Sequence, residues 1–312
     1  MKLKSNIDLL NVDSKIYSIY QNMRHFGWNT KGFSLDKDVY NHPTTVSDTI
    51  FKSLSYLIFL DSLQVNSLPY ISNYIKNEKN NGALTLALAE HVSQEALHVQ
   101  SYNYIVSVYP EDLKRKLYNA VEEDSLLNKR AKIICEPYKN FIDNPTKENY
   151  VLALFADYLL EGVLFFNGFM PFYELIEYFP NTQTIISLIH RDENLHTLLF
   201  QTILNRVLEE NDKSVSKQML LDYANNLLQP EIDFNVHLMG EHILKKDIED
   251  HTKYLLNLRL SALNIQKKHK AENPLKYLYN RSNFEEEMTA KTNVMEVKSS
   301  SYGITTDGWD DF

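Results

Sequence analysis

The sequence has few of the residues that form disulfide bonds and tight turns: its 312 residues include one cysteine, 8 glycines and 9 prolines. A single cysteine excludes an intramolecular disulfide and fits a reducing compartment, so we expect a cytoplasmic protein. Cys135 itself is predicted to fill a small space in the core. The scarcity of glycine and proline argues against a turn-rich β-protein and favours helices.

Long apolar runs and an excess of basic charge are also missing. No uninterrupted apolar run reaches the roughly 18 residues that cross a bilayer, and residues 1–6 are not followed by the apolar segment of a signal peptide. The 32 basic and 41 acidic residues give a net charge of −9, which disfavours binding to nucleic acid. Zinc-finger, P-loop and dinucleotide-binding patterns are absent too. We therefore predict neither a membrane nor a nucleic-acid partner.

Helical periodicity accounts for most of the chain before residue 281. We predict helices near residues 46–66, 82–108, 147–177, 181–209, 213–227 and 230–266, the first ending before Pro69 and the third distorted at Pro171. A cap at residues 180–182 would start the fourth helix. Residues 1–280 are long enough to bury one large core. Residues 281–312 are polar, acidic and aperiodic, so they are predicted to form a flexible tail.

The pattern Glu-x-x-His occurs twice, in Glu95-Ala-Leu-His98 and in Glu193-Asn-Leu-His196. Residues three apart lie on one face of a helix, so each copy directs one carboxylate and one imidazole the same way. Either copy alone is more often an exposed charged pair than a metal site. Apolar or aromatic residues flank both copies, however, and burial of both would bring four metal ligands together.

Asp61 and Glu161 each interrupt an apolar segment that should be buried. Acidic side chains are rarely buried unless they are paired or bind a metal, and two divalent cations would neutralise four such acids. We therefore predict an all-α, ferritin-like helical bundle with a carboxylate-bridged dimetal site in its core. The predicted ligands are Asp61, Glu95, His98, Glu161, Glu193 and His196. With this set complete, His91 and His190 are expected to support the ligands from outside or to lie at the surface.

Tyr102 follows His98 by four positions and therefore shares a helix face with the first Glu-x-x-His pair. Three apolar residues lie at helical spacing from the ligands on other helices: Phe165, Phe169 and Ile189. Residues of these types at such spacing are usually ordinary core. The alternative is that they keep water away from a phenol beside an oxidising metal centre, where a tyrosyl radical could survive.

Together these segments resemble the small, radical-generating subunit of class I ribonucleotide reductase, over a span from about residue 15 to the last residue. The resemblance rests on Leu-Asp61-Ser-Leu-Gln, Glu95-Ala-Leu-His98-x-x-x-Tyr102, Leu-Glu161-Gly-x-x-Phe-Phe and Arg191-Asp192-Glu193-x-Leu-His196. It implies that Asp61, Glu95 and His98 bind one ion. The other would be bound by Glu161, Glu193 and His196, with Glu95 and a second glutamate bridging the two.

The resemblance also assigns roles to residues around the metals. Tyr102 would be the radical tyrosine, and its apolar pocket would be formed by Phe165, Phe169 and Ile189. Asp192 would orient His98 through a hydrogen bond.

Two aromatic residues would carry the electron hole away from the metals. Trp28, in Arg-His-Phe-Gly-Trp28, matches the first, although the proline usual two positions later is replaced by Thr30. A packed core tryptophan is the alternative. The second is Tyr302, because Ser-Ser-Ser-Tyr302 followed by Gly-Trp-Asp-Asp-Phe312 resembles the end of class Ib small subunits. Exposed aromatic residues on a tail typically insert into a partner, here the large catalytic subunit.

The function implied by the resemblance is to start the reduction of ribonucleotides to deoxyribonucleotides. Two ions of iron or manganese, activated by an oxygen-derived oxidant, would oxidise Tyr102, and the hole would pass through Asp192, His98, Trp28 and Tyr302 to the large subunit. A homodimer is expected, and a flavodoxin-like activator is a further candidate partner. A ferritin-like dimetal oxidase or oxygenase is the alternative. The choice between iron and manganese and between diphosphate and triphosphate substrates stays open.

Overall fold

The computed structural model describes residues 13–38, 43–75, 82–210, 215–266 and 272–281. Helices dominate this part of the chain. They are α1 (Ser14–His25), η1 (Thr30–Gly32), α2 (Thr44–Ile75), α3 (Gly82–Val106), α4 (Glu111–Glu123), α5 (Ser125–Asp143), α6 (Lys147–Leu159), η2 (Leu160–Leu164), α7 (Phe165–Glu174), α8 (Pro180–Glu209), α9 (Lys217–Met239), α10 (Lys245–Ala262) and α11 (Lys276–Arg281).

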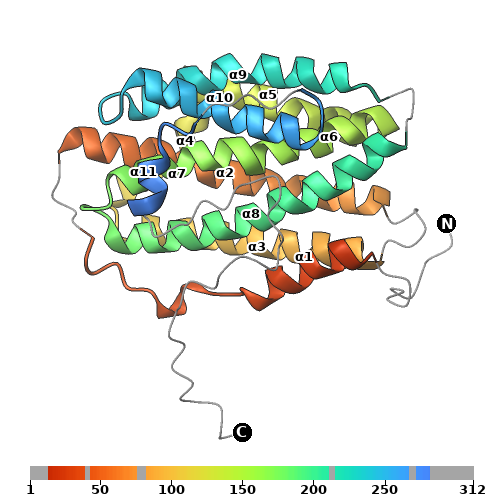
Figure 1. Cartoon of the computed structure of the whole chain (residues 1–312). Coiled ribbons are helices and arrows are strands. Elements are labelled where there is room, and N and C mark those ends of the chain that lie inside the picture. Colours follow the sequence, from red (N-terminus) through yellow and green to blue (C-terminus); the bar gives the residue numbers. More distant parts are fainter. Residues whose placement is uncertain (1–12, 39–42, 76–81, 211–214, 267–271, 282–312) are drawn as a thin grey trace, which may run out of the picture.

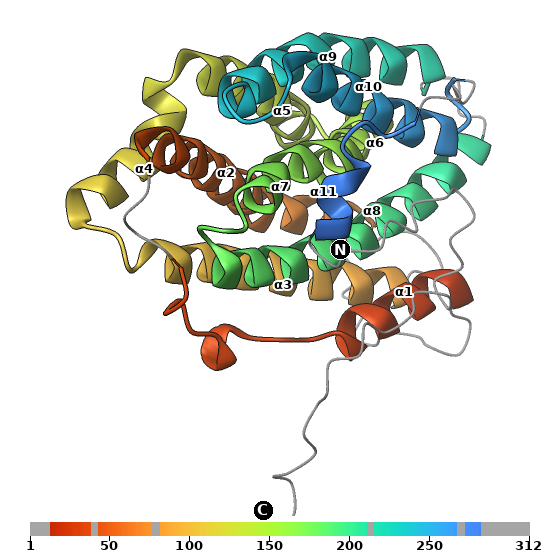
Figure 2. The same ribbon diagram turned by 60° about the vertical axis from the view of Figure 1, so that its left-hand side comes forward.

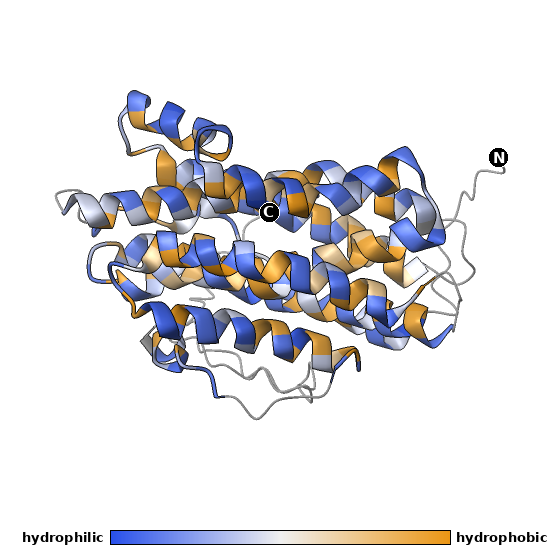
Figure 3. Ribbon diagram, turned by 90° about the horizontal axis from the view of Figure 1, so that it is seen from above, coloured by the Kyte–Doolittle hydropathy of each residue, from blue (hydrophilic) through white to orange (hydrophobic). Residues whose placement is uncertain are grey.

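The helices form a layered bundle. Helices α2, α6 and α7 lie between α9 and α10 on one side and α3 and α8 on the other (Figures 1 and 2). Helix α1 packs on α3 and α8 from outside, and α5 packs on α6 and α9. Hydrophobic and hydrophilic segments alternate along the helices (Figure 3), as in helices that bury one face. The predicted all-α, ferritin-like bundle is confirmed.

Two prolines lie inside helices at points where the sequence predicted a helix boundary. Helix α2 continues through Pro69 to Ile75, and α9 runs through Pro230 to Met239. An internal proline costs about 3 kcal/mol. In α2, the continued helix fully buries Leu68 and Ile71, each worth about 1.5–3 kcal/mol, which offsets that cost. The predicted break before residue 230 is therefore wrong, and the chain turns after Gly240 instead.

The sequence predicted a distortion at Pro171, whereas the irregular turn of this helix is η2, a single π turn around Glu161. There the Phe165 N–H donates to the Leu160 carbonyl, five residues back. Pro171 itself sits within α7 without ending it. π turns inside α-helices are frequent at functional sites, and this one falls on a predicted metal ligand.

The continuous helical stretch Lys147–Glu174 is long and apolar enough to cross a membrane, with a mean hydropathy of 1.5 in its most apolar window. However, 94% of that window is buried inside the bundle, so it is the core helix of the fold. The prediction from uninterrupted runs overlooked it because Asp157, Glu161 and Asn167 break the apolar run.

The structure also tests the start of the fourth predicted helix and the role of Cys135. Helix α8 begins at Pro180, close to the predicted residue 181, but the predicted cap is wrong because residues 180–182 form the first helical turn. The N–H groups of that turn are instead bound by Asp38, distant in sequence, which accepts hydrogen bonds from the backbone of Asn181 (2.8 Å) and Thr182 (3.2 Å). Cys135 is only partly buried, so it is not the core filler that we predicted. The predicted tail lies outside the described residues, apart from its first residue, Arg281, which ends α11.

Candidate metal centre

The six predicted metal ligands meet in the interior of the bundle. They come from α2, α3, η2 and α8, and each is 0% exposed. Together with His91, which was not among the predicted ligands, they form two groups whose ligand atoms all lie within 4.8 Å of one another. One group is Asp61, Glu95, His98 and Glu193, and the other is His91, Glu95, Glu161 and His196. The two groups share Glu95, as a centre for two neighbouring ions requires.

Two glutamates face both groups. Oε1 of Glu95 lies 2.9 Å from Nδ1 of His196, and Oε2 lies 3.6 Å from Nδ1 of His98. Glu193 places Oε1 3.0 Å from Nδ1 of His98 and Oε2 2.7 Å from Nδ1 of His196. Because each carboxylate presents one oxygen to each imidazole, Glu193 is positioned to be the second bridge, which the sequence left unnamed.

Many ligand atoms make no hydrogen bond within the described residues. These atoms are both oxygens of Asp61 and Glu95, Nδ1 of His98, Oε2 of Glu161 and Oε1 of Glu193. A buried polar atom without a partner is costly, and a buried charge more so. Two divalent cations would neutralise the four carboxylates and contact these atoms. The oxygen and imidazole donors therefore fit two hard transition-metal ions.

The pKa values of the buried acids do not all shift in the same direction: those of Asp61 and Glu193 are raised and that of Glu95 is lowered. Burial raises the pKa of Asp61 and of Glu193 well above the usual range, and the charge on Glu95 adds to both shifts. Burial also acts to raise the pKa of Glu95 itself, but the nearby His196 and the other imidazoles outweigh it and lower that pKa well below its usual value. The acids cannot all carry charge without added positive charge.

In the metal-free protein, protonated imidazoles supply that positive charge. Burial lowers the pKa values of His98 and His196, but the surrounding carboxylates outweigh it and raise both well above the usual value. A metal-bound imidazole must be neutral, so metal uptake has to release these protons.

The outward nitrogens of both predicted histidine ligands have carboxylate or amide partners. Nε2 of His98 lies 3.3 Å from Oδ2 of Asp192, and Nε2 of His196 lies 2.9 Å from Oε1 of Gln94. These bonds place a proton on each Nε2 and leave Nδ1 for a metal. Trp28 Nε1 donates to the same Asp192 oxygen (2.6 Å), and its ring stacks on His98 at 6.3 Å. The structure thus brings the predicted series His98, Asp192 and Trp28 into direct contact.

A polar network behind Glu161 was missed by the sequence analysis. Gln64 Nε2 donates to Oε1 of Glu161 (2.5 Å) and to Oδ1 of Asp157 (3.3 Å), and Tyr138 donates to Asp157. Burial and the charge on Glu161 raise the pKa of Asp157 to about 8, so its carboxyl group is largely protonated at neutral pH. The available signal was helical spacing, because Gln64 follows Asp61 by three positions and Asp157 precedes Glu161 by four.

Tyr102 is fully buried, and its hydroxyl has no hydrogen-bond partner among the described residues. Burial and the negative charges of Asp61 and Glu193 raise its pKa well above the usual value, so the phenol stays neutral. The predicted pocket residues are 0% exposed as well: Phe165, Phe169 and Ile189. The rings of Phe165 and Phe169 stack at 5.8 Å. The predicted relay residue Tyr302 lies outside the described residues.

His91 and His190 are both 0% exposed, so neither lies at the surface. His190 is outside the cluster, where its Nδ1 is 2.6 Å from the hydroxyl of Tyr173. His91 is inside it, with Nε2 2.8 Å from Oε1 of Glu161 and 2.9 Å from Oε1 of Glu95. The sequence contained this signal, because His91 precedes Glu95 by one helical turn.

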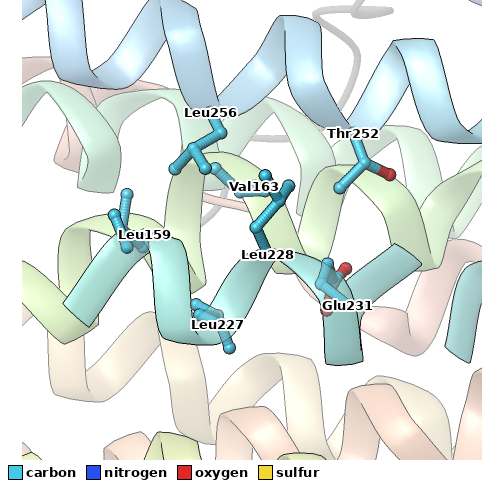
Figure 4. A pocket seen from close by; sticks show the side chains of 8 residues that line it. Leu159, Val163, Leu227, Leu228, Glu231, Thr252 and Leu256 are labelled. Atoms are coloured by element: carbon cyan, nitrogen blue, oxygen red, sulfur yellow. The ribbon is translucent and has the colours of Figure 1, made fainter. Parts of the chain in front are cut away.

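A small pocket elsewhere in the bundle offers no comparable chemistry. It lies between η2, α9 and α10, and mostly apolar side chains line it (Figure 4). Its one charged residue, Glu231, is occupied by Arg130 and by the side-chain amides of Asn167 and Asn235. The metal cluster is therefore the stronger candidate for function.

Comparison with known proteins assigns the family. The model of the family described as ribonucleotide reductase, small chain, matches residues 10–274. The chain belongs to this family. The ribonucleoside-diphosphate reductase subunit beta of Treponema pallidum is 30% identical over 308 residues, which cover 93% of this chain and 85% of that protein.

Solved structures agree with the assignment. The ribonucleotide reductase R2 subunit from Clostridium botulinum is 29% identical, with a TM-score of 0.79, over 86% of this chain and 88% of that one. The dimanganese(II) form of NrdF from Streptococcus sanguinis has a TM-score of 0.77 over 90% of this chain and 99% of that one. At 20% identity it shows the shared fold alone. Small chains of ribonucleotide reductase are soluble, form homodimers and work with a large subunit.

Elemental analysis tests the metal centre of this small chain. The folded protein should bind two transition-metal ions per chain, about 3.5–4 Å apart. Glu193→Ala removes a carboxylate that faces both ions, so at least one ion should be lost. Glu90→Gln, on the same helix as Glu95 but paired with Arg24 outside the cluster, should keep both. Full occupancy in Glu193→Ala would refute the ligand assignment.

Proposed function

We propose that this ribonucleotide reductase small subunit uses its buried cluster to generate and store a radical on Tyr102. The observation that carries the proposal is the cluster itself. Four fully buried acids lie together, several of their oxygens make no hydrogen bond within the described residues, and Glu95 shares helix α3 with the fully buried Tyr102. One ion would be held by Asp61, Glu95, His98 and Glu193. The other would be held by Glu95, Glu161, Glu193 and His196.

The bound ions supply a one-electron oxidant once an oxygen-derived oxidant has activated them. The protein keeps the Tyr102 phenol neutral through burial and nearby negative charge, so oxidation removes an electron and a proton together. Phe165, Phe169 and Ile189 are fully buried on the neighbouring helices. A dry environment limits quenching of the radical.

Transfer of the hole to the large subunit begins at the contacts of Trp28. The Trp28 indole donates to Asp192, which also contacts His98, so a continuous polar path joins the metal cluster to a partly buried aromatic ring. We propose that this path leads on to Tyr302 in the C-terminal segment. The aromatic and acidic residues 309–312 would anchor that segment in the large subunit.

The relatives are named ribonucleoside-diphosphate reductases, which favours ribonucleoside diphosphates as the substrates that the large subunit reduces. Iron and manganese both fit the donor set. A cytoplasmic location is supported by the single cysteine. Activation by a flavodoxin-like protein is part of the same proposal.

A dimetal oxidase is the alternative function. It would need an open cavity for an organic substrate beside the ions. In the described part of the chain, Tyr102 and the predicted pocket residues Phe165, Phe169 and Ile189 are 0% exposed, and the pocket of Figure 4 is lined by other residues. Complete burial of Tyr102 supports radical storage over oxidation of an external substrate.

Electron paramagnetic resonance tests the role of Tyr102. After metal loading and oxidation, a tyrosyl radical signal should appear, and Tyr102→Phe should abolish it while both ions stay bound, because phenylalanine cannot be oxidised at an accessible potential. Tyr56→Phe is a matched control, because Tyr56 is also buried but packs on Arg130. A radical that persists in Tyr102→Phe would place it on another tyrosine.

Two changes in the C-terminal tail should separate its role in binding the large subunit from its role in radical transfer. Deleting residues 309–312 should weaken capture by the large subunit and leave the radical content unchanged. Tyr302→Phe should leave the complex intact but reduce turnover to background, because the relay is broken. A pull-down and a turnover assay measure the two effects. Normal turnover by Tyr302→Phe would exclude it from the pathway and leave the tail as an anchor only.

A further inference from the structure

His91 occupies the interior of the cluster although it is not one of the six predicted ligands. It lies on α3 one turn before Glu95 and is 0% exposed. Its ring is 3.9 Å from the ring of His196, centroid to centroid. Its Nε2 belongs to the same group of closely spaced ligand atoms as Glu95, Glu161 and His196.

We infer that His91 is a seventh metal ligand, which binds through Nε2 the ion that Glu95, Glu161 and His196 hold. The inference rests on the proposed metal centre. Nε2 of His91 and Nδ1 of His196 each lie 2.9 Å from Oε1 of Glu95. The two imidazole nitrogens therefore point at the same place beside Glu95, as the nitrogens of two histidines that bind one metal ion do.

The charge of the cluster accommodates this ligand. Four carboxylates already balance two divalent ions, so a further acid would add uncompensated negative charge. A neutral imidazole adds a donor atom without changing that balance. The ion near Asp61 would have one imidazole, His98, whereas the ion near Glu161 would have two. The two positions are thus chemically different, since imidazole and carboxylate favour different metals.

The competing role for His91 is to donate a hydrogen bond to Glu161. Oε1 of Glu161 already accepts a 2.5 Å hydrogen bond from Gln64, so this oxygen is held without His91. Nδ1 of His91 has no hydrogen-bond partner in the described residues, and the ring is placed by packing against His196 and Phe200. Packing directs Nε2 at the cluster, whether or not that nitrogen carries a proton.

Substitution by glutamine distinguishes the two roles. Glutamine retains an N–H donor for Glu161 but has no imidazole. Full-length His91→Gln and His91→Ala should both bind one of two Mn²⁺ ions at least about 10-fold more weakly, with the other ion unaffected. Anaerobic titration, which detects free Mn²⁺ by electron paramagnetic resonance, measures this. His190→Gln, which alters a buried histidine outside the cluster, is the control and should keep both affinities. Wild-type affinities in His91→Gln would overturn the inference.

A crystal structure of the wild-type, Mn²⁺-loaded chain gives a second measurement that does not depend on a variant folding. Anomalous scattering locates the ions, and Nε2 of His91 should lie within about 2.3 Å of one of them. Ions held by the six other ligands, with Nε2 still hydrogen-bonded to Glu161, would overturn the role of His91 alone. An empty cluster at saturating Mn²⁺ would overturn both this role and the proposed metal centre.

Discussion

Four carboxylates buried together are the constraint on which the rest of this structure depends. Each uncompensated buried charge costs several kcal/mol, and a folded domain is stable by only about 5–15 kcal/mol. Asp61, Glu95, Glu161 and Glu193 are all 0% exposed, so the fold requires positive charge at its centre. Protons on the imidazoles can supply it in the absence of metal, and two cations can supply it in the functional protein.

The surrounding helices serve this centre in different ways. Helices α3 and α8 each present a carboxylate and an imidazole, and a π turn in the core helix carries Glu161. Gln94 and Asp192 fix the two histidines from behind. The connection from His98 through Asp192 reaches Trp28, whereas Tyr102 has no hydrogen bond in the described structure. In the proposed function, the residue that stores the radical, Tyr102, is thus separate from the hydrogen-bonded residues that would transfer it, although both lie at the same cluster.

Local spacing was enough to predict the ligands but not the shape of the helices. Glu95, His98, Glu193 and His196 could be found because three-residue spacing fixes a shared helix face in any helical fold. The continuation of α2 through Pro69 and of α9 through Pro230 could not, because burial of the residues beyond each proline depends on neighbouring helices.

Residues that support the ligands from other helices were harder to find. Gln64 and Asp157 act across the bundle, and their role appears only when α2 and α6 are packed together. His91 was assigned away from the metals because the ligand set looked complete, although its spacing from Glu95 placed it on the same face. The π turn at Glu161 has no signal in local propensity.

The stability of the protein with and without metal tests the need for central positive charge most directly. If two ions hold the cluster together, each should stabilise the fold by about 2.7 kcal/mol at a free concentration of 100 times its dissociation constant. Chemical unfolding of the chelator-treated and Mn²⁺-loaded full chain measures this. The account predicts that the unfolding free energy rises with Mn²⁺ concentration, with a slope that corresponds to two ions released on unfolding. Equal unfolding midpoints in chelator and in saturating Mn²⁺ would contradict it.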